Sequence, residues 1–125
     1  MSHYLLEIAY TPEAWAAQLE NPKDRTEVIR PVLESVGARF ECLYYAFGDR
    51  DIVGIIEAPD NVSVAAISLA FSAGGALKSC RTTPLMTVQE GMEAMRRGFR
   101  AYGVYKPPSE GAPAGTRSRE KVRAN

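Results

Sequence analysis

Four consecutive residues, Gly48-Asp49-Arg50-Asp51, place two carboxylates around a guanidinium between two apolar runs that are typical of strands. Charged groups so close together could bind a ligand or move protons. A tight hairpin uses the same residue types, because Gly supplies the positive φ of the turn and Asp accepts hydrogen bonds from the local backbone. We therefore interpret the segment chiefly as a turn. A role for Asp51 in a ligand site stays open, because Asp51 begins the strand that follows.

His3 and Glu57 form a candidate pair for proton transfer. If two strands pair so that position 6 lies beside position 54, His3 lies close to Glu57 on the same face of a sheet. A neighbouring carboxylate raises the basicity of an imidazole, so the pair could act as a general base. The alternative is that the pair has no functional role.

Glu7 lies near the centre of the same expected face and is harder to explain as structure alone. A buried carboxylate needs a cationic partner, and Arg81 or Arg39 could supply one. A structural ion pair is favoured over a catalytic acid. No catalytic residue is therefore assigned firmly, and the candidates are Glu7, His3 and Glu57.

A second group of residues could bind a small ligand. Arg81 is followed by two threonines, and a guanidinium beside hydroxyls suits a carboxylate or a phosphate, although Arg81 could equally form a salt bridge across a dimer. Of Tyr44 and Tyr45, one is expected in the core and the other beside an interface or cavity. The ligand-binding candidates are Tyr45, Asp51, Arg81 and Thr83.

The residues that usually hold metals are scarce. The chain has one His, no Cys-x-x-Cys motif and two distant cysteines, Cys42 and Cys80, which are expected to be buried thiols. We expect neither a metal nor a cofactor. The N-terminal segment MSHYLLEIAY resembles no secretion signal, so a cytoplasmic location is expected.

The composition is that of one globular domain with an added tail. The chain has 125 residues, of which 46% are hydrophobic and 24% charged, and no apolar run approaches the length of a membrane helix. We expect one domain over residues 1–103 and a tail over 104–125. The tail is rich in Pro and Gly and carries five basic and two acidic residues. It is interpreted as packing on a partner subunit or as flexible, and nucleic-acid binding is the less favoured reading.

Hydrophobic periodicity and turn residues predict seven elements. Thr11 and Pro12 predict the start of the first helix, and Asn21-Pro22 predicts a break within it. Pro84 predicts that the last strand lies at a sheet edge or contains a bulge. The expected strands are residues 2–10, 38–47, 51–58 and 76–88, and the expected helices are 12–37, 60–75 and 89–102.

This order predicts an α+β fold of the ferredoxin-like βαββαβ type, followed by an additional C-terminal helix and an extended tail. Right-handed crossovers place the first and third strands in the centre of the sheet and both helices on one face. The other face then carries several large apolar side chains, which we expect to be Leu5, Leu43, Tyr45, Phe47, Val53 and Ile55. Because these side chains are too apolar for open water, we predict that a second copy covers this face and encloses a semi-apolar cavity.

Two segments resemble the GYD-domain family of small bacterial and archaeal proteins. The segments are YYAFGDRDIVGIIEAPDN and GGALKSCRTTPLMT, and the resemblance extends over roughly residues 4 to 90. Arg50 stands where the family name implies Tyr, so any role of that tyrosine is in doubt here. The resemblance implies the dimeric α/β-barrel superfamily, which includes cofactor-free monooxygenases, isomerases and ligand-binding modules, and it implies no particular reaction.

Together these observations predict a homo-oligomeric protein, a homodimer or larger, that acts as a small-molecule-binding or assembly module without a membrane partner. The alternative is a cofactor-independent oxygenase or isomerase whose site lies in the dimer cavity. That alternative would use Glu7, His3 and Glu57 to handle protons.

Overall fold

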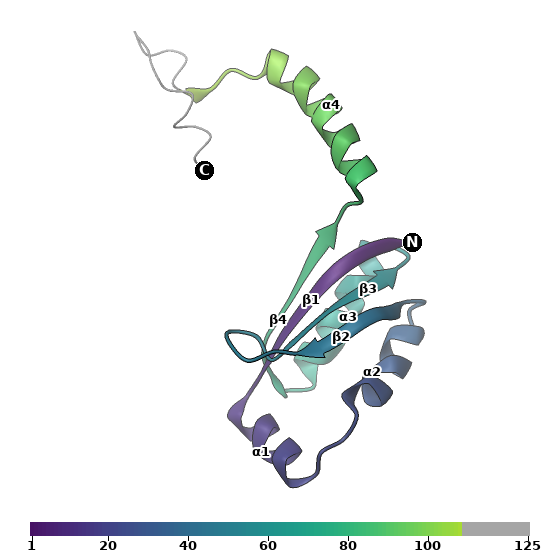
Figure 1. Ribbon diagram of the computed structural model, residues 1–125, viewed down its shortest axis with the longest axis vertical. Helices are drawn as coiled ribbons and strands as arrows, with labels where there is room; N and C mark the ends of the chain where they lie inside the picture. The colour runs from purple at the N-terminus through teal and green to yellow at the C-terminus, as the bar shows by residue number, and fades with distance from the viewer. Residues whose placement is uncertain (109–125) are drawn as a thin grey trace. The chain divides into compact units, whose positions relative to one another are not determined.

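The computed structural model describes residues 1–108, so the expected contacts of the tail lie almost wholly outside the described residues. The chain divides into two compact units, Met1–Met86 and the residues from Thr87 onward. The first unit contains a four-stranded antiparallel sheet in the order β2-β3-β1-β4 (Figure 1). Its elements are β1 (Ser2–Tyr10), α1 (Pro12–Glu20), α2 (Arg25–Glu34), β2 (Arg39–Tyr45), β3 (Ile52–Ala58), α3 (Asn61–Ala73) and β4 (Leu77–Leu85).

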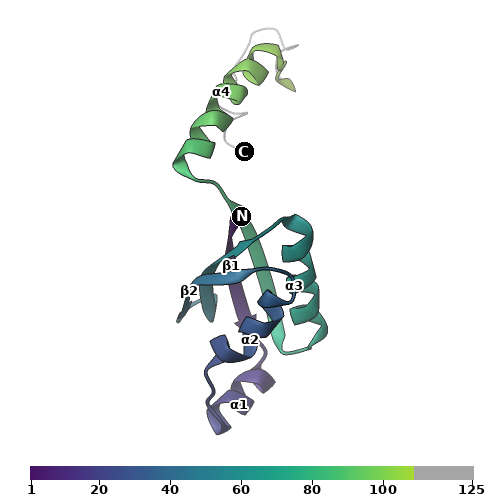
Figure 2. The same ribbon diagram turned by 90° about the vertical axis from the view of Figure 1, so that its right-hand side faces the viewer.

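This topology confirms the predicted α+β, ferredoxin-like fold. The strands β1 and β3 occupy the centre, and β4, which contains Pro84, lies at an edge where the missing N–H of proline is tolerated. Figure 2 shows α2 and α3 on the same side of the sheet. The other side carries no helix of the first unit, and we call it the helix-free face.

Local signals explain where the helices begin. The side chain of Thr11 accepts a hydrogen bond from Ala14 N, and Pro12 follows at the first helical position. Asp24 caps α2 in the same way by accepting from Thr26 N, so the expected first helix is two short helices separated at residues 21–24. Asp60 caps α3 by accepting from Ser63 N.

The core lies between the sheet and the helices α2 and α3. Alternate residues of β1 and β3 are buried, as the period of two in a strand requires. The largest fully buried side chains are Leu6, Ile8, Leu33, Ile52, Ile56 and Ile67. These side chains come from both the sheet and the helices, so burying them holds the helices against one face of the sheet. The intervening residues of β1 and β3 point to the other face.

Strand β2 departs from the expected pattern because it contains a β-bulge. Phe40 pairs with Ile56 but Cys42 already pairs with Ile55, so Glu41 is the extra residue. An extra residue moves every later side chain to the opposite face. Leu43 and Tyr45 therefore lie on the helix side, where Leu43 packs against the core, and their expected position on the helix-free face was wrong.

Gly48 also differs from expectation. Among the described glycines only Gly37 and Gly75 have positive φ, at 78° and 81°. The connection between β2 and β3 spans residues 46–51, so it is longer than a tight two-residue hairpin. The hairpin therefore does not depend on a left-handed glycine at position 48, and its closing contacts come from other residues.

The second unit contains α4 (Val88–Val104), a helix of 17 residues. Thr87 and Glu90 form a reciprocal capping box, in which the Thr87 side chain accepts from Glu90 N and the Glu90 side chain accepts from Thr87 N. None of the helices within residues 1–108 has the length and apolar character needed to cross a membrane.

Candidate functional site

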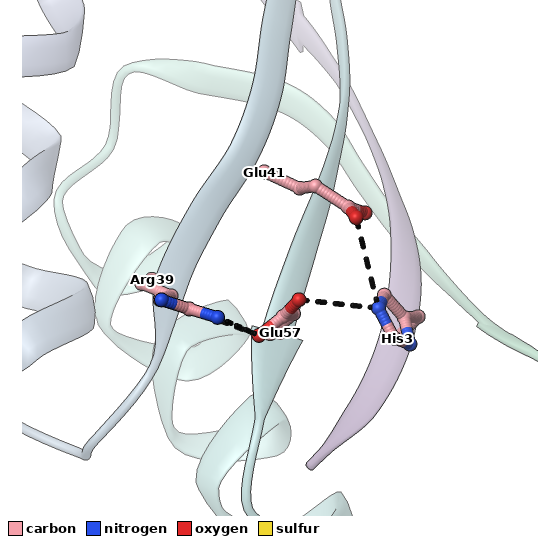
Figure 3. Close-up of polar contacts among 4 residues, drawn as sticks. All are labelled: His3, Arg39, Glu41 and Glu57. Atoms are coloured by element: carbon pink, nitrogen blue, oxygen red, sulfur yellow. Dashed lines mark hydrogen bonds and ion pairs between the residues drawn. The ribbon is translucent and has the colours of Figure 1, made fainter.

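On the helix-free face, the side chains of His3, Glu41 and Glu57 lie close together near the N-terminal end of β1 (Figure 3). His3 pairs with Glu57 and Leu6 with Gly54, so the register expected for these two strands is confirmed. The Nε2 atom of His3 lies 3.2 Å from a carboxylate oxygen of Glu57 and 3.8 Å from one of Glu41. Glu41 was not singled out in the sequence as a candidate, although it follows Arg39 by two residues and regular alternation already places both on the same face.

Arg39 completes this cluster from the side of β2. Its Nε and Nη2 atoms donate to Oε1 of Glu57 at 2.9 and 2.7 Å. These hydrogen bonds, together with the positive charge of Arg39 and the nearby His3, hold the pKa of Glu57 below its ordinary value of 4.5. Glu57 is therefore an anion at neutral pH, and its carboxylate lies between Arg39 and His3.

The cluster also has the ligand types of a metal site. One atom each from His3, Glu41 and Glu57 can be chosen so that all lie within 4.8 Å of one another. However, the guanidinium of Arg39 already neutralises Glu57 and would repel a second cation. The arrangement is therefore less suited to a divalent metal than its ligand types alone suggest.

Replacing Arg39 by Gln is expected to raise the pKa of Glu57 toward 4.5, because two charge-assisted hydrogen bonds are lost. A carboxylate whose pKa is lowered by folding stabilises the folded state above its unfolded pKa and loses this contribution as pH falls through the folded pKa. The variant should therefore lose less stability than the parent when the pH falls below about 4.5. An NMR titration of the Glu57 carboxyl carbon measures the shift directly.

Arg30→Gln is the matched control, because Arg30 pairs with Glu27 on the exposed side of α2. It should leave the Glu57 titration unchanged. An Arg39 variant with an unaltered Glu57 titration would show that this ion pair does not form in solution, where salt screens exposed charges.

Glu7 has a different partner from those expected. Arg81 lies beside it in the register of β1 and β4, and Arg39 belongs to the cluster of Glu57. The ion pair that the structure shows joins Glu7 to Arg50, with 4.0 Å between a carboxylate oxygen and Nε. Arg50 thus has a partner on the helix-free face, which gives the residue at this turn a structural role.

The four expected ligand-binding residues do not lie together. Arg81 and Thr83 pair with Glu7 and Leu5, which places them on the helix-free face of β4. Tyr45 lies on the other side of the sheet, with its ring centroid 6.4 Å from that of Trp15. The structure therefore does not unite these residues in one pocket.

The side chain and the backbone of Asp51 both make contacts that give the Gly48–Asp51 segment a structural role. Its Oδ2 atom accepts from the backbone N of Tyr10 at 2.8 Å and from Trp15 Nε1 at 3.2 Å. Its own backbone N donates to the carbonyl oxygen of Ile8 at 2.8 Å. Asp51 therefore ties the start of β3 to the end of β1 and to α1.

A pocket of about 280 Å³ lies on the helix side, between α2, α3 and β1. Its lining includes six large apolar side chains, Ile8, Val28, Ile29, Val32, Phe71 and Leu77, together with Tyr10 and Arg25. The Nε donor of Arg25 is buried and has no hydrogen-bond acceptor among the described residues. Burial raises the pKa of Tyr10 above 10.0, and a side-chain hydrogen bond with Arg25 together with the charge of its guanidinium opposes part of that rise.

Sequence reasoning did not single out Tyr10 or Arg25. A helical signal was present nonetheless, because Arg25, Ile29 and Val32 follow one another at spacings of four and three residues. A cation that occupies a position of the apolar face of a helix is the pattern that could have indicated the pocket. The two cysteines are unpaired as expected, but they are half-buried and not fully buried, and burial raises the pKa of Cys80.

The split βαβ sheet, with helices on one face and a paired-charge cluster on the other, defines an α+β protein of the ferredoxin-like class. A protein-family model described as the GYD domain matches residues 4–95. The chain therefore belongs to the GYD-domain family, as its strand and turn segments predicted. A search of the curated proteins returns no match.

Proposed function

We propose that this protein is a homo-oligomeric module that binds a small carboxylic acid with an apolar body in the pocket between α2, α3 and β1. The observation that carries the proposal is the buried Nε donor of Arg25, which has no acceptor among the described residues although it lies at an apolar pocket. A buried donor without an acceptor is costly, and a ligand that supplies the acceptor removes that cost.

The chemistry of the pocket favours one class of ligand. A guanidinium is well shaped for a carboxylate, and the hydroxyl of Tyr10 can add a second polar contact at the same end. The remaining walls offer aliphatic and aromatic carbon, which suits an apolar body. At about 280 Å³ the pocket lies at the small end of the range for ligand sites, so the ligand is expected to be small.

Replacing Arg25 by Met tests the binding site with octanoate as the probe. Octanoate is expected to bind the unmodified protein more tightly than octanol does, because only the carboxylate pairs with Arg25. In Arg25→Met this preference should fall by about 10- to 100-fold, since one charge-assisted contact is lost. Isothermal titration calorimetry measures both affinities.

Arg30→Met is the control, because Arg30 lies on the same helix but is ion-paired with Glu27 on the exposed side. It should leave both affinities unchanged. Equal binding of octanoate and octanol by the unmodified protein, or no binding of either, would contradict the proposed site.

The homo-oligomeric part of the proposal is supported by the helix-free face. Leu5, Val53 and Ile55 are half-buried there, and exposed Tyr44 joins them after the bulge. These side chains lie on the same face as the cluster of His3, and burying each large side chain contributes about 1.5–3 kcal/mol. A second copy related by a two-fold axis would cover both faces with one set of contacts.

Ile55→Asp tests this interface, because it places a charge in the middle of the helix-free face without touching the core side of β3. It is expected to shift the self-association constant by at least about 100-fold toward dissociation. Sedimentation equilibrium measures the shift. Leu69→Asp, at an exposed site on α3, is the control. Identical association of both variants would show that the helix-free face is not the interface.

A further inference from the structure

Helix α4 carries an apolar stripe whose spacing is that of paired helices. Five large apolar residues follow one another at intervals of four, three, four and three residues, namely Val88, Met92, Met95, Phe99 and Tyr102. This spacing is the a/d pattern of a coiled-coil seam and places all five side chains on one face. All five are exposed, with Met95 at 73% and Phe99 at 78%.

The helix has features that a solitary helix would not favour. None of its 17 residues is buried, although its sequence is strongly amphipathic. Gly91, Gly98 and Gly103 lie within it, and glycine is a poor helix former. An isolated helix of this length and composition is marginal in water, because most helical stability in proteins comes from packing an apolar face. The apolar stripe is therefore suited to packing against another surface.

We propose that α4 pairs antiparallel with α4 of a second copy around a two-fold axis at Met95. The sequence is complementary to itself about this residue. With Met95 facing its own copy, Phe99 lies opposite Gly91 of the partner and Met92 lies opposite Gly98. A side chain added at either glycine would meet nothing within 4 Å in the single chain, so the space beside both is open to a partner.

The charges of α4 are distributed with the same antiparallel symmetry. The acidic residues Glu90 and Glu93 lie in the first half of α4, and Arg97 and Arg100 lie in the second half. About the axis at Met95, Glu90 lies level with Arg100 of the partner and Glu93 with Arg97. These groups lie on the outer faces of the two helices, farther apart than a Debye length of about 8–10 Å, so the direction of pairing rests on the fit of Phe99 and Met92 beside Gly91 and Gly98 of the partner.

The area is sufficient for a specific contact. Two copies of the stripe would take ten large apolar side chains out of water. At the areas that such side chains bury, this amounts to roughly 1,000 Å², which reaches the lower bound for a specific interface. Methionine side chains also adapt their shape to the opposing surface, which suits a pair at the axis.

This contact is distinct from the helix-free face and from the pocket, so it does not depend on the proposed function. A chain with two different two-fold interfaces assembles into a closed tetramer or an open chain of dimers. Loss of one interface leaves a dimer held by the other. The two proposals therefore fail in distinguishable ways.

Phe99→Asp tests the pairing, with Val104→Asp as the matched control because Val104 is equally exposed but lies away from the stripe. Light scattering of the full chain is expected to show four or more copies for the parent and for Val104→Asp, and two for Phe99→Asp. If the helix-free face is not an interface, the parent shows two copies and Phe99→Asp shows one, which still supports the pairing. Equal masses for both variants would overturn it.

Gly98→Leu separates pairing from helix stability. Leucine is a much better helix former than glycine, so an unpaired helix would become more stable. If Met92 of the partner occupies the space beside Gly98, the larger side chain should weaken association by at least about 10-fold despite the gain in helicity. Unchanged association with increased helical circular dichroism would contradict the proposed contact.

Disulfide trapping tests the direction of pairing in a background with Cys42→Ser and Cys80→Ala. Met95→Cys is expected to form a cross-linked dimer on mild oxidation. Val88→Cys should not, because two copies of residue 88 lie roughly 20 Å apart in the antiparallel pair. Cross-linking of Val88→Cys with itself would overturn the antiparallel arrangement. Absence of cross-linking at both sites, with binding of the parent to anionic vesicles, would assign the stripe to a membrane surface instead.

Discussion

Asp51→Ala is expected to lower the free energy of unfolding by about 3 kcal/mol, although Asp51 lies in a surface connection. Its Oδ2 atom is the acceptor for Tyr10 N and for Trp15 Nε1. Tyr10 is buried, so the substitution leaves a main-chain donor without an acceptor in a place that water does not readily reach. Hydrogen bonds to a charged acceptor contribute about 1.5–3 kcal/mol each, which sets the scale.

The expected change is a fall in Tm of about 12–20 °C, measured by circular dichroism or calorimetry. Asp49→Ala is the matched control, because Asp49 is an exposed aspartate of the same connection. It should change the free energy of unfolding by less than about 0.5 kcal/mol. Asp51→Asn keeps one acceptor oxygen and should lie between the two. If Asp51→Ala were as mild as Asp49→Ala, the tie from β3 to α1 would not be what holds this end of the sheet.

The two central strands could be predicted from the sequence because one of their two faces is unambiguous. In β1 the residues Tyr4, Leu6 and Ile8 alternate with His3, Leu5 and Glu7, and only one of these sets is wholly apolar. A one-residue slip would exchange the two sets, so the register is strongly determined. The pairing of His3 with Glu57 follows from that register alone.

Strand β2 could not be predicted in the same way. Both of its faces contain large apolar or aromatic side chains, so a bulge changes the face of Leu43 and Tyr45 without an evident cost in the pattern. The bulge at Glu41 depends on how β2 fits the rest of the sheet. Glu41, by contrast, could have been included in the cluster expected around His3, because regular alternation already places it on the same face as Arg39.

The long-range contacts of Asp51 and the position of Arg25 at the pocket also could not be predicted from the sequence. Asp51 was assigned to the turn by residue type, but its partners Tyr10 and Trp15 are distant in sequence. Arg25 begins a short helix directly after its capping residue, where a basic residue looks like ordinary surface. The burial of the Nε atom of Arg25 results from how α2 packs on the sheet. Residue type thus predicts local roles, and long-range partners decide which of those roles the protein uses.

Gly54→Ala is expected to be the other severe substitution, and its cause is steric. Gly54 lies on the buried side of β3, opposite Leu6 on one neighbouring strand and Leu43 on the other. A Cβ added there would lie 2.5 Å from the carbonyl oxygen of Cys42 and 2.8 Å from Cδ1 of Leu43. The carbonyl belongs to the backbone beside the bulge, so the clash cannot be relieved by rotating a side chain.

The expected loss is about 2–4 kcal/mol in the free energy of unfolding, measured by urea denaturation. Gly48→Ala is the control, because nothing lies within 4 Å of an added Cβ there and the residue does not have positive φ. That control should be neutral or stabilising by up to about 1 kcal/mol, since alanine restricts the unfolded chain. If Gly48→Ala proved destabilising, the turn would require glycine at position 48, as the sequence suggested.

The same substitution connects the packing of the sheet to the cluster on its other face. Relief of the Gly54 clash requires β2 to move away from β3 beside Glu41, and Arg39 lies in the same strand. The contacts from β2 to His3 and Glu57 would then lengthen together. In Gly54→Ala the pKa of Glu57 should therefore rise toward 4.5, as is also expected when Arg39 is replaced. An unchanged Glu57 titration in a destabilised Gly54 variant would show that β2 yields only at Leu43, and that the charge cluster is independent of the bulge.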